Sequence, residues 1–319
     1  MASPFWINNI CVPTWTDFVK GWINSYSTRL IDSTPPPRTL PPLHNGLLIR
    51  KALIEDIEQL PEFWSRWYST TKSARCIVPV NHILKINSSG SADIFVCVKD
   101  GIVIGSIVRR WLKGLHMREV VWPRAGIIDY FCIHPAHRKK GIGRSLLTFL
   151  HNSTLFTEGA ILPQLMLWEG LQPTIPPASL GLFLYKKCVK PITVITNKAI
   201  ELPWSDTLWK SLQRGKDIWN ESEGQQPEET SLWAIGSHRL AIWNTFHRSV
   251  PEGLLIGIIV GGDSAAATAA TMSHGHPYGI LLLPGYLAVD GWTIDSPYQW
   301  ISYNTQMNFI SYQFPGIYL

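Results

Sequence analysis

The sequence lacks the features that mark a membrane-spanning, a secreted or a polybasic protein. Its longest apolar run, residues 253–262, is too short to cross a bilayer and is followed by Asp263. No cationic segment followed by an apolar one opens the chain, so we expect no secretory signal. Lysine and arginine occur without long basic blocks, and the net charge is only +5. We therefore expect a soluble, intracellular and cytoplasmic protein with no membrane span that does not bind nucleic acid.

Cysteine is also scarce, with five residues and no pair spaced as Cys-x-x-Cys. Cys97 and Cys132 lie in apolar, strand-like runs, which predicts reduced and buried thiols; a nucleophilic Cys132 is the less favoured alternative. His274 and His276 have no further ligands at the spacing of a zinc site, so a glycine-rich surface turn is predicted there. We expect no metal.

What the sequence does contain is enough apolar material for a substantial core. Hydrophobic residues make up 45% of the 319 positions and charged residues 16%, which is typical of a globular chain. Proline is dense at 33–43, and residues 213–231 are polar and rich in breakers. We predict a proline-rich extension at 1–45, a first domain at 46–195 and a C-terminal domain at 196–319.

Hydrophobic periodicity from residue 46 onward predicts a mixed α/β sheet. The expected order is a strand at 47–50, a helix from 54, a hairpin over 93–112 that turns at 99–101, a strand at 125–135, a helix from 142, a strand at 164–169, a short helix at 180–191 and a strand at 192–202. Further strand-like runs are 232–235, 239–246, 254–260, 278–284 and 308–314.

The segment between the strand at 125–135 and the next helix predicts an anion site. Glycine-rich turns at a helix start leave backbone N–H groups unpaired, and the helix dipole adds positive charge there. Gly141 and Gly143 let a phosphate approach the backbone, and Arg138, Lys139, Lys140 and Arg144 supply charge. The alternative is a solvated basic turn before an ordinary helix.

Three phosphate-binding patterns compete for this turn. A P-loop needs Gly-Lys-Ser/Thr, which is absent, and a dinucleotide fingerprint needs a third glycine where Leu146 stands. The pattern that fits is Arg/Gln-x-x-Gly-x-Gly/Ala, present at 138–143 with Ile142 as its variable fifth residue. In the following helix Ile142, Leu146, Leu147 and Leu150 fall on one apolar face.

These residues resemble the GNAT superfamily of acetyl-CoA-dependent N-acetyltransferases. The resemblance covers about 46–195 and includes "IRKALIEDIEQL", "VKDGIVIGSI", "IIDYFCIHPAHRKKGIGRSLL" and "LFLYKK". It implies a GNAT fold in which the amides of 138–143 hold the pyrophosphate of acetyl-CoA, the co-substrate. It also implies that the strands at 127–133 and 164–169 splay apart, so that backbone N–H groups near Phe131, Cys132 and Ile133 polarise the thioester carbonyl.

The resemblance implies direct attack by an amine, which requires a base and an acid. Tyr185 matches the tyrosine that serves the family as acid, although a packing role is the alternative. Asp129 has the face parity of Phe131 and Ile133; it is the predicted base or amine ligand, or else a carboxylate merely hydrogen-bonded at a strand edge. Glu169 is a weaker base candidate. We expect His134 and His137 to shape the turn or contact phosphate.

Some family positions differ, and Ala178, Val189 and Lys190 stand where the family often has Asn and Gly-Phe. The acceptor pocket and the acid are therefore less closely matched than the loop.

A weaker resemblance, to the two-lobed N-myristoyltransferases, bears on the second half of the chain. It is carried by "IIDYFCIHPAHRKK" and by "VKPITVI", which stands where two lobes would join. In that family a terminal carboxylate is the base, and this sequence ends in "FPGIYL". The C-terminal domain is then a degenerate second GNAT-like lobe.

The predicted function is transfer of an acetyl group from acetyl-CoA to a primary amine of a peptide, protein or small molecule. A long-chain acyltransferase and a non-catalytic CoA-binding module are the alternatives. The first would differ in its preference for acyl-chain length, and the second would show no turnover.

Overall fold

The computed structural model describes fifteen segments and five isolated residues. They are 29–30, 46–68, 74–112, 114–117, 120–122, 124–158, 164–169, 179–189, 230–235, 238–250, 253–262, 278–284, 293–303, 305–306 and 316–318, with residues 37, 39, 40, 43 and 162. The predicted strands at 192–202 and 308–314, the linker up to residue 229 and the turn with His274 and His276 lie outside the described residues.

The first half of the chain alternates strands with three helices. Its elements are β1 (Arg29–Leu30), β2 (Leu47–Lys51), α3 (Ile54–Trp67), β3 (Ala74–Cys76), α4 (Val80–Ser88), β4 (Ala92–Lys99), β5 (Ile102–Leu112), β6 (Gly114–Met117), β7 (Val120–Trp122), β8 (Ala125–Ile133), α5 (Ile142–Glu158) and β9 (Gln164–Glu169). The described part of the second half consists of strands. They are β10 (Ser179–Val189), β11 (Thr230–Ile235), β12 (His238–Ser249), β13 (Leu255–Gly262), β14 (Tyr278–Pro284), β15 (Thr293–Tyr303), β16 (Thr305–Gln306) and β17 (Gly316–Tyr318).

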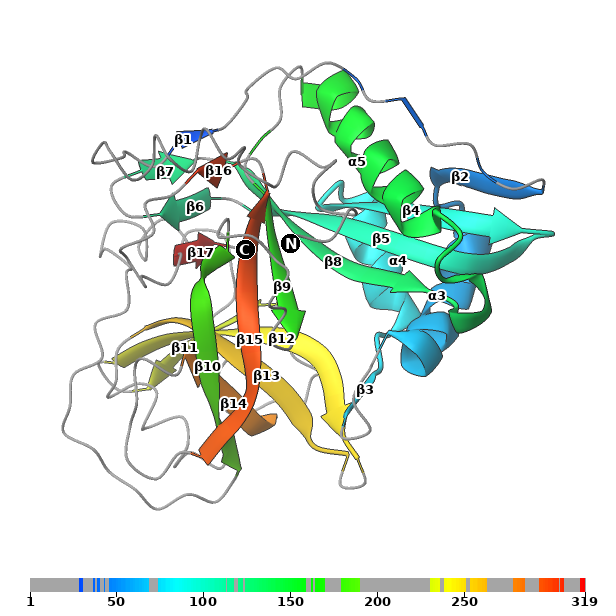
Figure 1. Ribbon diagram of the computed structural model, residues 1–319. Coiled ribbons are helices and arrows are strands. Elements are labelled where there is room, and N and C mark those ends of the chain that lie inside the picture. Colours follow the sequence, from blue (N-terminus) through cyan, green and yellow to red (C-terminus); the bar gives the residue numbers. More distant parts are fainter. Residues whose placement is uncertain are drawn as a thin grey trace.

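One large mixed sheet holds most of these strands, in the order β11-β12-β13-β14-β10-β15-β9-β8-β5-β4-β2, with β3 paired to β12. Helix α5 packs on one face of the first-half strands, and α3 and α4 pack on the other (Figure 1). Strand β15 lies between β9 and β10, so the sheet continues across the predicted domain boundary. The division into domains stays a prediction.

Most strands and helices of the first half follow the sequence prediction. The hairpin of β4 and β5 turns at Asp100 and Gly101, which both have positive φ angles of 50° and 78°, as a type I′ turn requires. Helix α5 buries Ile142, Leu146, Leu147 and Leu150, which confirms the predicted apolar face. Cysteines 76, 97 and 132 are free and buried, as predicted.

The helix predicted at 180–191 is wrong, because residues 179–189 form strand β10. This strand pairs antiparallel with β14 on one edge and with β15 on the other. A short apolar run fits a strand or a helix equally well by periodicity, and here partners about 100 residues away decide the outcome (Tyr185 lies opposite Pro284).

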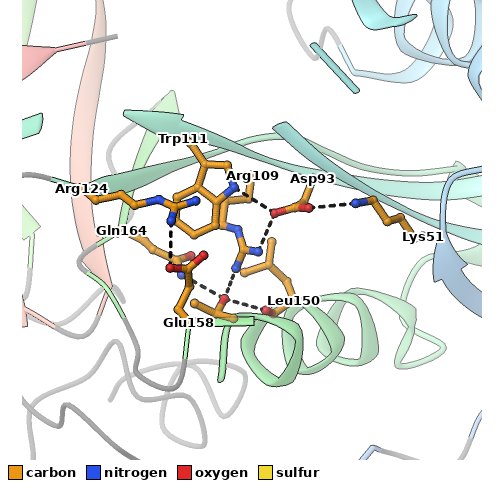
Figure 2. Close-up of polar contacts among 9 residues, drawn as sticks. Lys51, Asp93, Arg109, Trp111, Arg124, Leu150, Glu158 and Gln164 are labelled. Atoms are coloured by element: carbon orange, nitrogen blue, oxygen red, sulfur yellow. Dashed lines mark hydrogen bonds and ion pairs between the residues drawn. The ribbon is translucent and has the colours of Figure 1, made fainter. Parts of the chain in front are cut away.

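An ion network lies between the sheet and α5 (Figure 2). Arg109 of β5 is fully buried; it donates to Asp93 at 2.7 Å and to the hydroxyl of Thr154 on α5, and its guanidinium lies 4.2 Å from the centre of the Trp111 ring. Lys51 reaches the other oxygen of Asp93 at 3.1 Å. The network connects β2, β4 and β5 with the C-terminal half of α5.

Within the described segments, no helix has the length and apolar character needed to cross a membrane.

Candidate active site

The basic turn forms an open positive surface at the start of α5. After a short 3₁₀ turn at Pro135–His137, Lys139 and Gly141 adopt left-handed backbone angles, with φ of 63° and 81°. Arg138, Lys139, Lys140 and Arg144 are exposed, and nothing lies within 4 Å of the place where a Cβ of Gly141 would stand. Left-handed residues next to a helix start turn successive N–H groups outward, which suits an anion.

Gly143 lies on the inner side of the same turn and packs closely on β8. A Cβ added there would lie 3.0 Å from Cδ1 of Ile133 and 3.1 Å from Cζ of Phe131. The two glycines therefore have different functions: Gly141 gives the turn its backbone conformation and Gly143 lets the helix start approach the central strand.

Strands β8 and β9 pair in parallel only at their beginnings. Their register joins Gly126 to Gln164, Ile127 to Leu165 and Ile128 to Met166, although β8 continues to Ile133 and β9 to Glu169. In Figure 1 the two strands diverge beyond this point. The predicted separation of the two central strands is thus present, and it begins beside Asp129.

A β-bulge in β8 changes the face on which Asp129 lies. Two residues, Tyr130 and Phe131, stand opposite Ile107 of β5, and Tyr130 has a φ of 47°. Phe131 and Ile133 consequently pack toward α5 on one face of the sheet. Asp129 lies on the other face, where it accepts a hydrogen bond from Tyr68 at the end of α3. The predicted shared face of Asp129, Phe131 and Ile133 is therefore wrong, because strict alternation does not hold through a bulge.

Both carboxylate oxygens of Asp129 accept hydrogen bonds. Oδ2 accepts from the buried guanidinium of Arg110 at 2.7 Å, while Oδ1 accepts from the Tyr68 hydroxyl and, at 2.8 Å, from the backbone N–H of Tyr130. Burial, followed by the charge and hydrogen bond of Asp129, raises the pKa of Tyr68 well above its ordinary value. The Tyr68 hydroxyl therefore stays protonated and donates to the carboxylate.

Tyr68, Arg110 and Asp129 form a cluster, to which the second half of the chain adds His247. A bulge in β12, with Phe246 at a φ of 55°, precedes it, and β12 pairs with β3 so that His247 lies opposite Cys76. The centre of the imidazole ring lies 5.7 Å from that of Tyr68, and Nδ1 lies 2.9 Å from the carbonyl oxygen of Thr245. Burial lowers the pKa of His247.

Sequence reasoning missed Tyr68, Arg110 and His247. Arg110 did leave a signal, because two consecutive arginines in an otherwise apolar strand require buried partners. Tyr68 and His247 left no such signal, since they are brought together by pairing between strands more than 170 residues apart.

The remaining predicted residues fall in different places. Cys132 is buried on the α3 side, and burial raises its pKa to about 12, which agrees with a core thiol. His134 accepts the N–H of Ala136 and so shapes the turn, as predicted. Tyr185 lies on β10 and Glu169 on β9 opposite Tyr298, and their side chains lie outside the described structure.

Residues 90–187 match the family model of the acetyltransferase (GNAT) domain. This stretch contains the basic turn, α5 and the diverging strands, so this part of the chain is similar to a GNAT domain in both sequence and fold. A search of curated proteins finds no significant match.

Over most of its length the chain has the fold of N-myristoyltransferase. A structure of the Saccharomyces cerevisiae enzyme with bound myristoyl-CoA and inhibitors has a TM-score of 0.60 at 11% identity and covers 89% of this chain and 87% of its own. A second structure of that enzyme with bound myristoyl-CoA has a TM-score of 0.59 at 10% identity, over 89% and 85%. At this identity the likeness concerns the fold alone.

Proposed function

We propose that the protein is an N-acyltransferase that moves an acyl group from acyl-CoA directly to a primary amine. The turn at 138–143 carries this proposal, since it combines outward amides and three exposed cations, with Arg144 as a fourth, at a helix start beside the point where β8 and β9 separate. An extended thioester bound by its phosphates at the turn would reach the gap between the two strands.

In this proposal the thioester oxygen lies against the stretch Phe131, Cys132 and Ile133, where it accepts from the backbone N–H groups that point away from β5. The support is that β8 makes no described pairing with β9 after Ile128, although its other edge stays paired to β5 through Ile133. N–H donors fixed in a sheet stabilise the negative charge that develops on the oxygen without reorganising.

Acetyl-CoA is the donor that the sequence predicts, and the GNAT family match supports it. Myristoyl-CoA is the second candidate, favoured by the likeness of nearly the whole chain to an enzyme solved with that ligand. A peptide, a protein N-terminus or a small amine remains the proposed acceptor.

Calorimetric titration tests the proposal and distinguishes the two donors. We expect CoA and one acyl-CoA to bind the wild type, and binding to fall at least about tenfold in Gly141→Asp, because a carboxylate then faces the phosphates across open space. Arg66→Ala, which removes an exposed cation on α3 that is not part of the turn, is the matched control. Absence of binding by CoA, acetyl-CoA and myristoyl-CoA would rule out the proposed function.

Tyr185 is retained as the proposed acid for the departing thiolate, and Tyr185→Phe tests it. If the phenol protonates the CoA sulfur, kcat should fall about 100-fold with little change in acyl-CoA affinity. Steady-state rates at several pH values provide the measurement. Because β15 separates the strand of Tyr185 from β9, an unchanged kcat would assign this residue to packing.

A further inference from the structure

The cluster around Asp129 joins the two halves of the chain. Tyr68 directly follows α3, Arg110 lies on β5 and Asp129 on β8, whereas His247 lies on β12. The short strand β3 provides the connection, because it pairs with β12 over Ala74–Cys76 and Ser249–His247. The GNAT family match ends at residue 187, so nothing in that match includes His247.

The imidazole of His247 has a defined tautomer. A carbonyl oxygen only accepts hydrogen bonds, so the 2.9 Å contact with Thr245 places the proton of a neutral ring on Nδ1. The second nitrogen, Nε2, then carries the lone pair. This arrangement, with one nitrogen held by a carbonyl and the other left basic, is the one that a general base needs.

The hydrogen bonds of Asp129 give it a different role from that of His247. Its carboxylate oxygens already accept from Arg110, Tyr68 and the N–H of Tyr130, and the guanidinium forms an ion pair with it. Such a carboxylate is well suited to hold neighbouring groups in position and to stabilise a nearby positive charge. It is less suited to take a proton from an amine.

The location of the cluster agrees with a role in the transfer. The turn at 138–143 and Gly143 lie on the α5 side of the sheet, whereas Asp129, Tyr68 and His247 lie on the α3 side. The separation of β8 and β9 begins between these two sides, immediately after Ile128. An acyl-CoA bound at the turn and an amine bound at the cluster would therefore approach each other from opposite faces.

We propose that Nε2 of His247 accepts the proton of the acceptor amine, with Tyr68 and Asp129 as positioning residues; this rests on the acyl transfer proposed above. The amine nitrogen forms a bond with the thioester carbonyl carbon, and the carbon–sulfur bond breaks. Its electron pair leaves with the CoA sulfur. One proton passes from the nitrogen to Nε2, and the resulting imidazolium is stabilised by the Asp129 carboxylate before it releases the proton to solvent.

The surroundings of His247 keep the ring neutral at pH 7. Its pKa is lowered by burial, against smaller opposing effects of the Thr245 carbonyl and of the Asp129 charge. Of the other titratable groups, Tyr68 has its ring beside the imidazole and Cys76 of β3 lies opposite His247, and burial raises the pKa of both; the Arg110 guanidinium is paired with Asp129. The cluster thus contains one neutral base beside one carboxylate.

The test uses the full chain and measures single-turnover CoA release between pH 5 and 9. The donors are acetyl-CoA and myristoyl-CoA, and the acceptors are a peptide with a free N-terminus and an N-terminally blocked peptide with one lysine. We expect the wild-type rate to rise with pH through an inflection below about 6.5, the ordinary pKa of histidine. His247→Gln should lose this inflection and about 100-fold in rate, while its acyl-CoA affinity stays within twofold.

Two further variants separate a proton-transfer role from a structural one. His82→Gln is the matched control, because His82 lies on α4 with its ring 4.5 Å from that of Phe246 beside the same bulge, and we expect it to keep the wild-type pH profile. Asp129→Asn removes the charge that favours the imidazolium, so the inflection should move to lower pH.

Two outcomes would overturn the role of His247. One is a His247→Gln variant with the wild-type rate and pH profile; the other is an NMR spectrum of ¹⁵N-labelled protein that shows the His247 proton on Nε2 at pH 7. Neither outcome affects the proposed function, which falls only if the wild type fails to bind any of the three CoA species.

Discussion

Asp93→Ala is expected to destabilise the protein by about 3 kcal/mol or more, because it leaves the guanidinium of Arg109 buried without its carboxylate. Arg109 has no exposed side-chain surface, so water cannot replace the lost partner. The indole N–H of Trp111 also loses its acceptor, since it donates to Asp93 at 3.0 Å (Figure 2). Urea unfolding followed by circular dichroism measures the change.

Two controls distinguish the contribution of the buried ion pair Asp93–Arg109 from that of the exposed pair Asp93–Lys51. Lys51→Met removes the more exposed partner of Asp93, which is 60% accessible, and should cost less than about 1 kcal/mol. Replacing both partners, in Asp93→Leu/Arg109→Met, should recover much of the loss because no charge is then left buried. A loss in Asp93→Ala no larger than that in Lys51→Met would contradict the argument.

The ion pairs of Asp93 with Arg109 and Lys51 make the free energy of unfolding depend on pH. Burial alone would raise the pKa of Asp93, but the hydrogen bonds and charges of Arg109 and Lys51 outweigh it and lower the pKa. The stabilisation is therefore complete above the unfolded value of about 3.9 and is lost as the pH falls through the lower folded value. This acid-dependent part of the unfolding free energy should be missing in Asp93→Ala.

Gly143→Val is expected to weaken acyl-CoA binding about tenfold or more. The added side chain meets Phe131 and Ile133 where even a Cβ would lie 3.1 Å and 3.0 Å from them, and overpacking of this kind costs about 1–3 kcal/mol. The start of α5 must then move away from β8, and the amides of the turn lose their arrangement. Calorimetric titration with the acyl-CoA that binds the wild type measures the effect.

A second substitution tests this steric explanation. Phe131→Ala removes the ring that the new side chain meets, so we expect Gly143→Val/Phe131→Ala to bind acyl-CoA more tightly than Gly143→Val alone. Wild-type affinity in the single Gly143→Val variant would show that the close approach of helix and strand has no part in binding.

The sequence predicts local features of the fold well. The Asp100-Gly101 turn, the apolar face of α5 and the turn at 138–143 depend on residues close together in the chain, and each is present in the structure. Strand β10 was predicted as a helix because its partners, β14 and β15, lie about 100 residues away. Local propensity cannot register such distant pairing.

In the candidate site, too, the part formed by neighbouring residues is predictable from the sequence and the part formed by distant segments is not. The turn at 138–143, which we propose binds phosphate, is a contiguous motif and is visible in the sequence. The cluster of Tyr68, Arg110, Asp129 and His247 is assembled from four separate segments. The bulge at Tyr130 also reverses the face of Asp129, and nothing in the local sequence indicates a bulge at that residue.

The position of β15 has a consequence for co-translational folding. Synthesis delivers β9 and β10 more than 100 residues before the strand that lies between them. Until residues 293–303 emerge, the outer edge of β9 has no neighbour and can pair with other chains. The growing chain must therefore keep that edge protected until residues 293–303 have been made and can pair with it.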